Sequence, residues 1–225
     1  MTAEPGEAAD PRPARHPMPP ASAPANRFLY RLRFEKTGPA RFYSHHDMMR
    51  LFEHGLRRAE FPLSLSAGFN PRPRVTFLSA LPLGVESVDE WVEIELTEAL
   101  DAEEFGKRMA GQFPEGVRIR EAGAAVGRVA AGEAEYEATL GEAAVDVAAL
   151  LARKEIPVER RTSEGAARTV DIRPWILRAQ AADGKLTFAI RITDNGSARP
   201  EEVLRELGVP GARVVRTRSV MAAKK

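Results

Sequence analysis

The chain has 225 residues, a net charge of +1, an apolar content of 44% and no cysteine. The absence of cysteine excludes disulfides, thiolate zinc sites, a cysteine nucleophile and any iron–sulfur cluster ligated by this chain. No run approaches the roughly 20 apolar residues of a membrane span, and the start does not resemble a secretory signal. We therefore expect a cytoplasmic protein that does not contact a membrane.

Charge is distributed unevenly along the chain. The net charge is −1 for residues 1–26, +6 for 27–80, −10 for 81–165 and +6 for 166–225. One interpretation is a basic face, built from the second and last blocks, that binds a polyanion. In the other interpretation, the acidic and basic blocks attract each other across an interface. The pattern by itself leaves both open.

The first 125 residues predict an arm followed by alternating strands and helices. Residues 1–26 contain seven prolines and no apolar period, which predicts a disordered arm. Strand-like alternation begins at Arg27, and Ser44 is placed to cap a helix that Pro62 ends. The expected elements are a strand at 28–35, the helix after Ser44, strands at 74–81 and 90–96, a helix at 101–112 and a strand at 117–122.

The region 133–221 repeats this order loosely. Its expected elements are strands at 134–140, within 156–172, and at 176–181, 186–193 and 212–221, with helices at 142–153 and 199–207. Strand-helix-strand-strand-helix-strand is the split βαβ order. We therefore predict an α+β protein made of two tandem ferredoxin-like units, 27–125 and 133–221, with antiparallel sheets and helices on one face.

The start of the first helix holds residues with useful chemistry. His45 is predicted to lie at the edge of the core beside a helix N-terminus, which keeps the ring neutral and makes it a candidate general base. The favoured alternative is a structural histidine, because no second catalytic group is identifiable. Asp47 is placed to cap backbone N–H groups, and could instead orient His45 or an arginine. No H-x-x-x-H spacing joins His46 or His54 to these residues, so we expect no metal and no cofactor.

A site for an anionic group is the main prediction for the stretch 41–74. Guanidinium groups bind phosphates in a bidentate manner, and the prolines of the Gly-Phe-Asn-Pro-Arg-Pro-Arg turn hold its residues in fixed directions. Phe42 and Phe69 are candidates for stacking on bases, although we expect Phe42 to pack in the core. The predicted binding residues are Ser44, Asp47, Arg50, Gly68, Phe69, Asn70, Arg72 and Arg74. Asp171 and Arg173 form either a second contact point or a local salt bridge.

Three long motifs link the chain to a known family. They are Phe42-Tyr43-Ser44-His45-x-Asp47-x-x-Arg50, Gly68-Phe69-Asn70-Pro71-x-Pro73 and Leu81-Pro82-Leu83-Gly84-x-x-Ser87-x-x-Glu90, extended by Asp171-Ile172-Arg173-Pro174 and Arg199-Pro200. Over roughly residues 27–220 the chain resembles the uncharacterised domain of radical-SAM-linked proteins. In that family the domain is fused to B12-binding-type radical S-adenosylmethionine proteins or occurs alone. The resemblance implies a radical SAM protein acting in trans, because this chain lacks the three cysteines of such an enzyme.

These observations give three functional hypotheses. The leading one is an accessory protein that binds RNA, such as tRNA or rRNA, or another anionic substrate for modification by a partner enzyme. The second is a metal-independent RNA-processing enzyme that uses His45; tandem ferredoxin-like units are also the architecture of CRISPR RNA-processing endonucleases, a likeness of fold alone. The third is a protein adapter that docks a basic partner on the acidic block. We do not expect catalytic activity from the chain on its own.

Overall fold

The computed structural model describes residues 27–161 and 165–223, so the predicted arm 1–26 lies outside the described residues. The elements are β1 (Phe28–Lys36), the 3-10 turn η1 (Gly38–Phe42), α1 (His45–Arg58), β2 (Val75–Phe77), β3 (Glu86–Leu96), α2 (Ala102–Ala110), β4 (Val117–Ala124), β5 (Val129–Thr139), α3 (Val147–Ala152), β6 (Pro157–Arg161), β7 (Ala167–Asp171), the 3-10 turn η2 (Arg173–Trp175), β8 (Ile176–Ala182), β9 (Lys185–Arg191), α4 (Pro200–Glu206) and β10 (Val214–Ala223). None of the helices in this described part is long and apolar enough to cross a bilayer.

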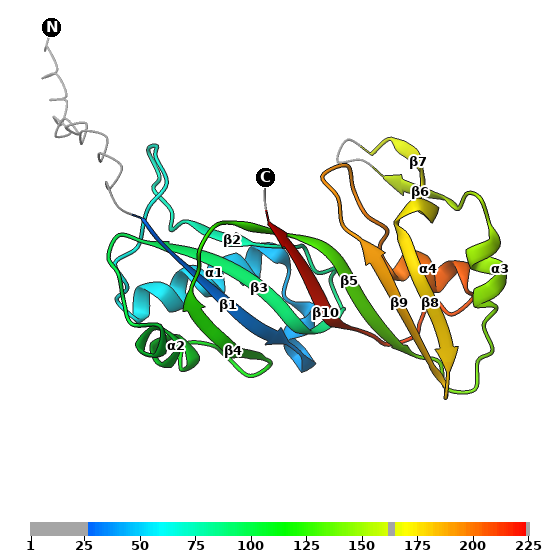
Figure 1. The fold of residues 1–225 in the computed structure, drawn as a ribbon, viewed down its shortest axis with the longest axis horizontal. Coiled ribbons are helices and arrows are strands. Elements are labelled where there is room, and N and C mark those ends of the chain that lie inside the picture. Colours follow the sequence, from blue (N-terminus) through cyan, green and yellow to red (C-terminus); the bar gives the residue numbers. More distant parts are fainter. Residues whose placement is uncertain (1–26, 162–164, 224–225) are drawn as a thin grey trace, which may run out of the picture.

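The strands confirm the α+β class but do not form two separate sheets. Eight of them make one sheet in the order β4-β1-β3-β10-β5-β9-β8, with β2 also paired to β3 (Figure 1). All pairs are antiparallel except β10 with β3, which runs parallel through Val215 opposite Glu86 and Arg216 opposite Ser87. The prediction of two sheets is therefore wrong, because β10 from the end of the chain joins the two halves. The weak strands predicted within 156–172 form a separate ribbon, β6 with β7.

Two predicted elements are shorter than their sequence patterns. The strand expected at 74–81 is reduced to β2, because β10 occupies the edge of β3 that a longer β2 would need. The chain leaves the sheet after Phe77 and crosses the helix-bearing face before β3 begins. The helix expected at 142–153 forms only as α3, which begins where the Asp146 side chain accepts a hydrogen bond from the Ala149 N–H at 2.8 Å.

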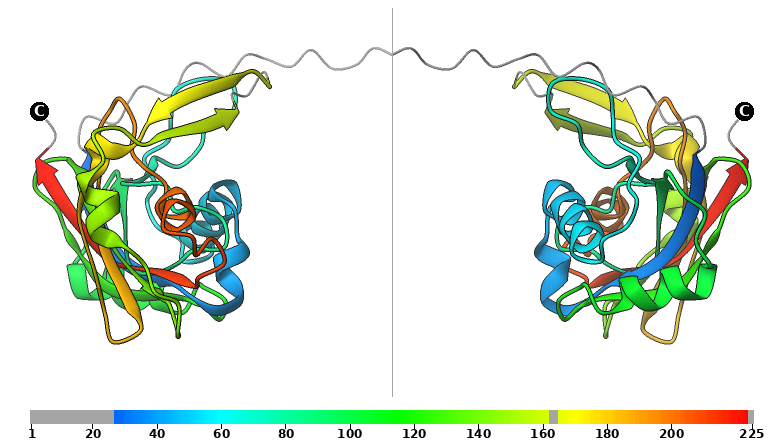
Figure 2. Two further views of the ribbon diagram at one scale, coloured as in Figure 1. Left: turned by 90° about the vertical axis from the view of Figure 1, so that its right-hand side faces the viewer. Right: turned by 90° about the vertical axis from the view of Figure 1, so that its left-hand side faces the viewer.

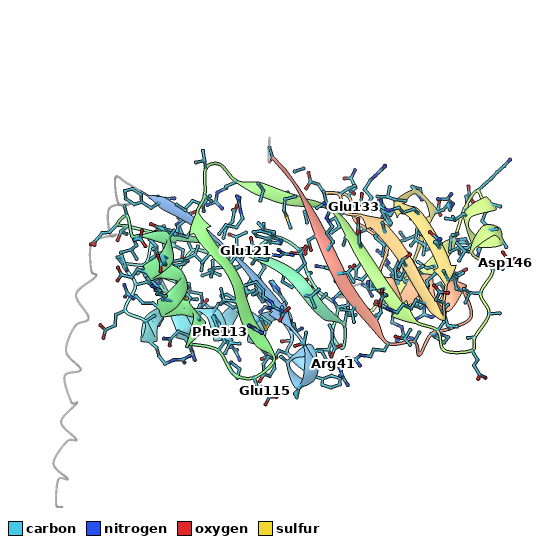
Figure 3. All side chains as sticks on the ribbon, turned by 60° about the horizontal axis from the view of Figure 1, so that its bottom comes forward. Arg41, Phe113, Glu115, Glu121, Glu133 and Asp146 are labelled. Carbon is cyan, nitrogen blue, oxygen red and sulfur yellow. The ribbon has the colours of Figure 1, made fainter. Side chains whose placement is uncertain are left out.

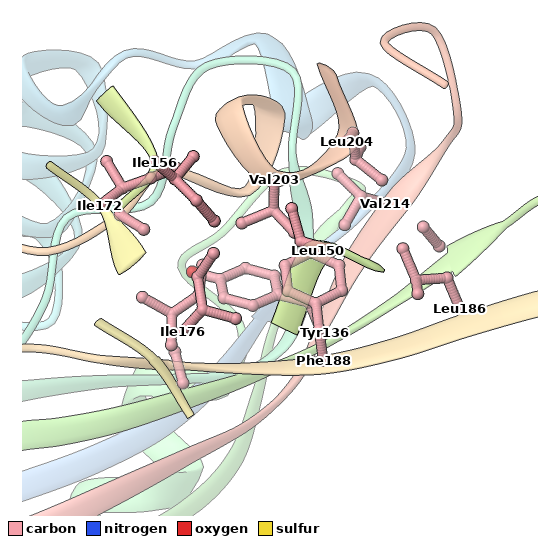
Figure 4. Packing of buried hydrophobic residues seen from close by; sticks show 14 of the residues in the cluster. Tyr136, Leu150, Ile156, Ile172, Ile176, Leu186, Phe188, Val203, Leu204 and Val214 are labelled. Atoms are coloured by element: carbon pink, nitrogen blue, oxygen red, sulfur yellow. The ribbon is translucent and has the colours of Figure 1, made fainter. Parts of the chain in front are cut away.

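The helices pack on the concave side of the curved sheet (Figure 2). Because side chains alternate between the two faces of β1, Tyr30, Leu32 and Phe34 point to the same side and pack in one apolar cluster with α1 and α2. The same alternation of side chains in β5 and β9 places Tyr136 and Phe188 in a second apolar cluster with α3 and α4 (Figure 4). Each half of the molecule therefore has its own core on the same continuous sheet.

The opposite face of the sheet carries paired charges (Figure 3). Glu93 accepts a hydrogen bond from Arg31 at 2.7 Å and Asp89 accepts one from Arg33 at 2.6 Å, and both carboxylates are buried. Glu121 on β4, labelled in Figure 3, accepts a second bond from Arg33 at 2.8 Å.

Ion pairs also join the halves of the chain. Buried Glu86 pairs with Arg41 from the first basic block at 3.5 Å and with Arg213 from the last block at 2.6 Å. Much of the acidic block is thus neutralised by the two basic blocks within the fold. This favours the second interpretation of the charge pattern for the residues that are paired.

Candidate functional site

The first turn of α1 is held by a capping box. Ser44 Oγ accepts a hydrogen bond from the Asp47 N–H at 3.2 Å, and Asp47 Oδ2 accepts from the N–H and the hydroxyl of Ser44 at 2.9 and 2.7 Å. These bonds from Ser44 hold the pKa of the Asp47 carboxyl below its usual range. The predicted cap is present, and it engages both side chains.

His45 borders a small cavity at the same end of α1. The cavity has a volume of about 20 Å³ and is also lined by Lys36, Ser79 and Glu90. The His45 ring meets the Phe77 ring edge-on, with centroids 5.4 Å apart. Partial burial, with smaller contributions from neighbouring positive charges, lowers the pKa of His45. The ring is therefore neutral at pH 7 and able to accept a proton.

Lys36 is a buried cation on the wall of this cavity. Its side chain is 3% exposed, and Nζ donates one hydrogen bond to the Tyr43 carbonyl at 2.7 Å. Burial lowers the pKa of Lys36, and the charge of Arg216 lowers it further, whereas Glu90 opposes the shift. Two buried basic side chains, Lys36 and Arg216, therefore lie near one buried carboxylate, that of Glu90.

Arg216 lies at the centre of the junction between the halves. Its guanidinium donates to Glu90 at 2.9 Å, to the Ser79 hydroxyl at 2.6 Å and to the Ala80 carbonyl at 3.0 Å. Two more bonds reach the Tyr136 hydroxyl at 3.2 and 2.9 Å. The five donors of an arginine are thereby all used. Arg216 consequently positions its neighbours and has no donor left for a ligand.

A larger cleft opens on the other side of segment 79–81. Its volume is about 480 Å³, within the range of small-molecule sites. The polar lining includes Tyr136, Arg199 and Glu201, and the apolar lining includes Leu81 and Ile190. The cleft is built from both halves, since segment 79–83 belongs to the first and β5, β9 and α4 belong to the second. It depends on the junction that β10 creates.

An exposed aromatic side chain lies next to this cleft. Phe42 is 60% exposed, and the Arg41 guanidinium lies over its ring at 4.6 Å from the centroid. The Arg41 carbonyl accepts a hydrogen bond from the Gly84 N–H at 2.9 Å, which places η1 against the segment that lines the cleft. Leu83 in that segment is also exposed, at 66%. The expectation that Phe42 packs in the core is wrong, because η1 turns its side chain outward.

The Gly68–Arg72 turn lies away from His45. The arms of this loop pair at Leu65 and Pro73, next to Glu95 at one end of β3, whereas Phe77 beside His45 is opposite Val92. The three residue steps along β3 from Val92 to Glu95 span about 10 Å, and the loop extends further beyond the sheet (Figure 1). The residues predicted to form one anion site in the stretch 41–74 are therefore not brought together around His45.

The predicted arginines fall into two groups. Arg50 and Arg72 are exposed, and their side chains form no ion pair or hydrogen bond with any described residue. Arg74 is engaged, with Nε donating to the Leu65 carbonyl at 3.2 Å and lying 3.9 Å from Glu95. The tip residues Gly68, Phe69 and Asn70 are all exposed, and Phe69 is fully so.

Asp171 and Arg173 serve the local structure of the second half. Asp171 Oδ1 accepts from the N–H groups of Ile156 and Arg173 at 2.7 and 3.0 Å. The Arg173 guanidinium donates to three backbone carbonyls, those of Leu151, Arg153 and Ile176, at 2.8, 3.1 and 3.0 Å. They form no salt bridge with each other, and these hydrogen bonds all go to the backbone of the second half.

The sequence patterns did not identify four residues of the junction as site candidates. Glu90 and Arg199 stand in the family motifs, so the resemblance carried a signal for them. Tyr136 and Arg216 carried none, because each is one of several alternating residues in a strand and only strand pairing brings them together. Across the described ranges, no group of three His, Asp or Glu side chains is arranged to hold a metal ion.

Comparison with models of protein families finds a match for this chain. The match covers residues 29–200, which contain the capped helix, the Gly68 turn and segment 79–84. A search of curated proteins finds no match. The family description names no partner enzyme, so the association with radical SAM and B12 proteins stays a prediction. The chain belongs to the family described as an uncharacterized protein conserved in bacteria (DUF2344).

Proposed function

We propose that this protein binds single-stranded RNA across the junction of its two halves and presents it to a partner enzyme for modification. The observation that carries the proposal is Phe42, an aromatic ring held in solvent with Arg41 over one face, on η1, whose backbone is hydrogen-bonded to Gly84 next to the cleft residue Leu83. Such a ring offers a stacking surface for a base, and stacking is worth about 1–3 kcal/mol per base.

Charge near the cleft supports the same proposal. Arg199 lines the cleft and forms no ion pair with a described residue, and the buried guanidinium of Arg216 lies in the cleft wall. Phosphate groups are the common anionic feature of RNA, and their binding releases counterions. The partner proposed on the basis of the family resemblance is a radical SAM protein acting in trans, with tRNA or rRNA as the substrate.

The test is the affinity of the full chain for a short unstructured RNA, measured by fluorescence anisotropy. We expect affinity to fall steeply between about 50 and 200 mM salt. Phe42→Ala should weaken binding by roughly 5- to 150-fold, as expected for the loss of one stacked base. Arg199→Ala should reduce the slope of log affinity against log salt by about 1.

Matched controls separate the cleft from the rest of the surface. Phe69→Ala removes a more fully exposed aromatic ring on the distant loop, and Arg118→Ala removes an exposed arginine of β4 that forms no ion pair with a described residue. Neither should change the affinity. A larger loss for Phe69→Ala than for Phe42→Ala would place the RNA on the loop instead, and binding that does not respond to salt would contradict the proposal.

A catalytic role for His45 is the second candidate. The observation in its favour is that His45 and Lys36 both have lowered pKa values and border the same cavity, an arrangement used for acid–base chemistry. The RNA recovered from the binding assay provides the test. Shortened products that appear with wild type and not with His45→Ala would establish cleavage, and intact RNA in both would assign His45 to binding or structure.

For the fold, we propose that the first half is a ferredoxin-like unit. Its strands follow the order β4-β1-β3 with β2 on the outer edge of β3, and α1 and α2 share one core, which supports the assignment. The second half has its antiparallel strands in the order β10-β5-β9-β8 with α3 and α4 in one core. Its relation to the same unit is weaker, because β6 and β7 leave the sheet.

A further inference from the structure

One carboxylate in the cleft has an unusual environment. Glu201 and Glu202 are adjacent in the first turn of α4, and Glu202 is fully engaged by Arg160, at 2.7 Å for both contacts, and by the Arg199 N–H at 2.8 Å. Glu201 lines the cleft, and its Oε2 is shielded from solvent yet accepts no hydrogen bond from the described residues. A buried acceptor without a donor carries its full desolvation penalty. A rotation of the carboxylate that lets a ligand N–H in the cleft reach Oε2 would remove that penalty.

A donor lies in the same lining. The Tyr136 hydroxyl accepts two hydrogen bonds from Arg216, so its own proton is free to be donated. Burial raises the pKa of Tyr136, which keeps the phenol protonated, and the nearby charge of Glu201 acts in the same direction. One hydroxyl donor and one carboxylate thus line the same cleft, together with apolar side chains such as Leu81 and Ile190.

We propose that the cleft binds the Watson–Crick edge of a guanine base, with Tyr136 donating to O6 and Glu201 accepting from N1–H and the N2 amine. This rests on the proposed function when the base belongs to RNA, and a free guanine nucleotide has the same chemistry. The apolar lining suits the two faces of a flat ring, and about 480 Å³ accommodates a nucleoside.

Other bases match this arrangement less well. Adenine offers one N–H donor group and one acceptor on that edge, so one carboxylate oxygen stays unpaired. Uracil would place its O2 acceptor against Glu201, and cytosine has a single donor group followed by two acceptors. A good bidentate pair discriminates against the wrong base by a factor on the order of tenfold to a hundredfold. A guanidinium group of a partner protein could pair with Glu201, but it has no acceptor for Tyr136 and would be repelled by Arg199.

The experiment compares oligouridylates that differ only at the central base, which is G, A, C or U. Guanosine, inosine and adenosine 5′-monophosphates are titrated in parallel against the full chain. We expect at least about tenfold preference for G in both series, with inosine monophosphate intermediate because it lacks the N2 amine. Glu201→Gln should abolish the preference, since its amide group replaces an acceptor with a donor. Glu155→Gln, at an exposed glutamate outside the cleft that forms no ion pair with a described residue, should leave it unchanged.

The possible outcomes separate this inference from the RNA-binding proposal. Equal binding of all four oligonucleotides, or a preference for G that survives Glu201→Gln, overturns the guanine assignment and leaves RNA binding intact. Preference for guanosine monophosphate without binding of any oligonucleotide supports the guanine site and contradicts RNA binding. Glu201-dependent capture of an arginine-rich peptide, with no preference among nucleotides, overturns the assignment in favour of a protein ligand. Unchanged thermal unfolding of Glu201→Gln confirms that the variant is folded.

Discussion

Arg216 is the residue that most clearly connects the fold to the cleft. Its side chain is 2% exposed and contacts Glu90 of the first half and Tyr136 of the second half. A buried guanidinium requires both a counter-charge and saturated donors, and this one has both. By fixing the Ser79 and Tyr136 hydroxyls, it sets the direction in which the cleft can donate hydrogen bonds.

Replacing Arg216 by methionine should therefore be severe. Glu90 would remain buried without its partner, and loss of one member of a buried pair costs about 3–5 kcal/mol of unfolding free energy. Urea unfolding measures this value. Arg218→Met is the matched control on the same strand, because Arg218 is 66% exposed and lies 3.9 Å from Glu135, which limits its effect to about 1 kcal/mol or less. Similar losses for both variants would contradict the role assigned to Arg216.

At the scale of elements, segment 78–84 decides where the cavities lie. β3 offers one edge to β1 and divides the other between β2 and β10. The chain between β2 and β3 therefore cannot continue as a strand and runs over the sheet, between the His45 cavity and the larger cleft. A pairing constraint in the sheet thus produces the wall of the candidate site.

The capping box of α1 gives a prediction at this scale. Ser44→Ala should lower the free energy of unfolding by about 0.5–2 kcal/mol at pH 7, because an α1 N–H group loses its acceptor and Asp47 loses a donor. The folded-state pKa of Asp47 lies below its ordinary 3.8, so the stability contributed by the ionised carboxylate is present above that pH. It is lost as the pH falls through the folded-state pKa.

The difference between wild type and Ser44→Ala should consequently narrow in acid below about pH 3.8, which thermal unfolding at several pH values measures. Ser44→Thr retains a hydroxyl that can accept from the Asp47 N–H and donate to the Asp47 carboxylate, and should recover most of the loss. A difference that stays constant down to acid pH would show that the cap does not act through ionised Asp47.

At the scale of the whole molecule, the two cores share one sheet. β10 pairs with β5 along its length and with β3 at its start, while Glu86 binds arginines of both halves. Such a connection favours cooperative unfolding, even though each half has its own apolar cluster. RNA presented at the junction would then contact parts of both halves that are held in a fixed relation.

The two tryptophans allow a direct test, because Trp91 lies in β3 and Trp175 in η2. Single-tryptophan proteins made by Trp91→Phe and Trp175→Phe report on opposite halves. We expect their urea midpoints to coincide with that measured by circular dichroism on the same variant. Separate midpoints for fluorescence and circular dichroism in either variant would show that the halves unfold independently.

The sequence by itself determined the local structure of this protein. Ser44 and Asp47 specify the start of α1, and alternation in β1, β5 and β9 specifies which side chains face the core, because caps and strand periodicity depend on neighbouring residues. The family match over residues 29–200 also follows from the sequence, whereas the link to radical SAM proteins stays a prediction. The charge pattern left open whether the basic blocks bind a polyanion or pair with the acidic block, because it could not show which arginines form ion pairs with carboxylates.

Only the tertiary structure decided which strands are neighbours. Alternation shows that Tyr136 and Arg216 each face one side of a strand, but it does not show that β10 lies between β3 and β5. That pairing buries Arg216 against Glu90, ends β2 early and opens the cleft that Glu201 lines. The outward position of Phe42 was likewise decided by η1, which packs against the backbone at Gly84. The candidate site is therefore a product of contacts between residues distant in sequence, whose energies no local pattern contains.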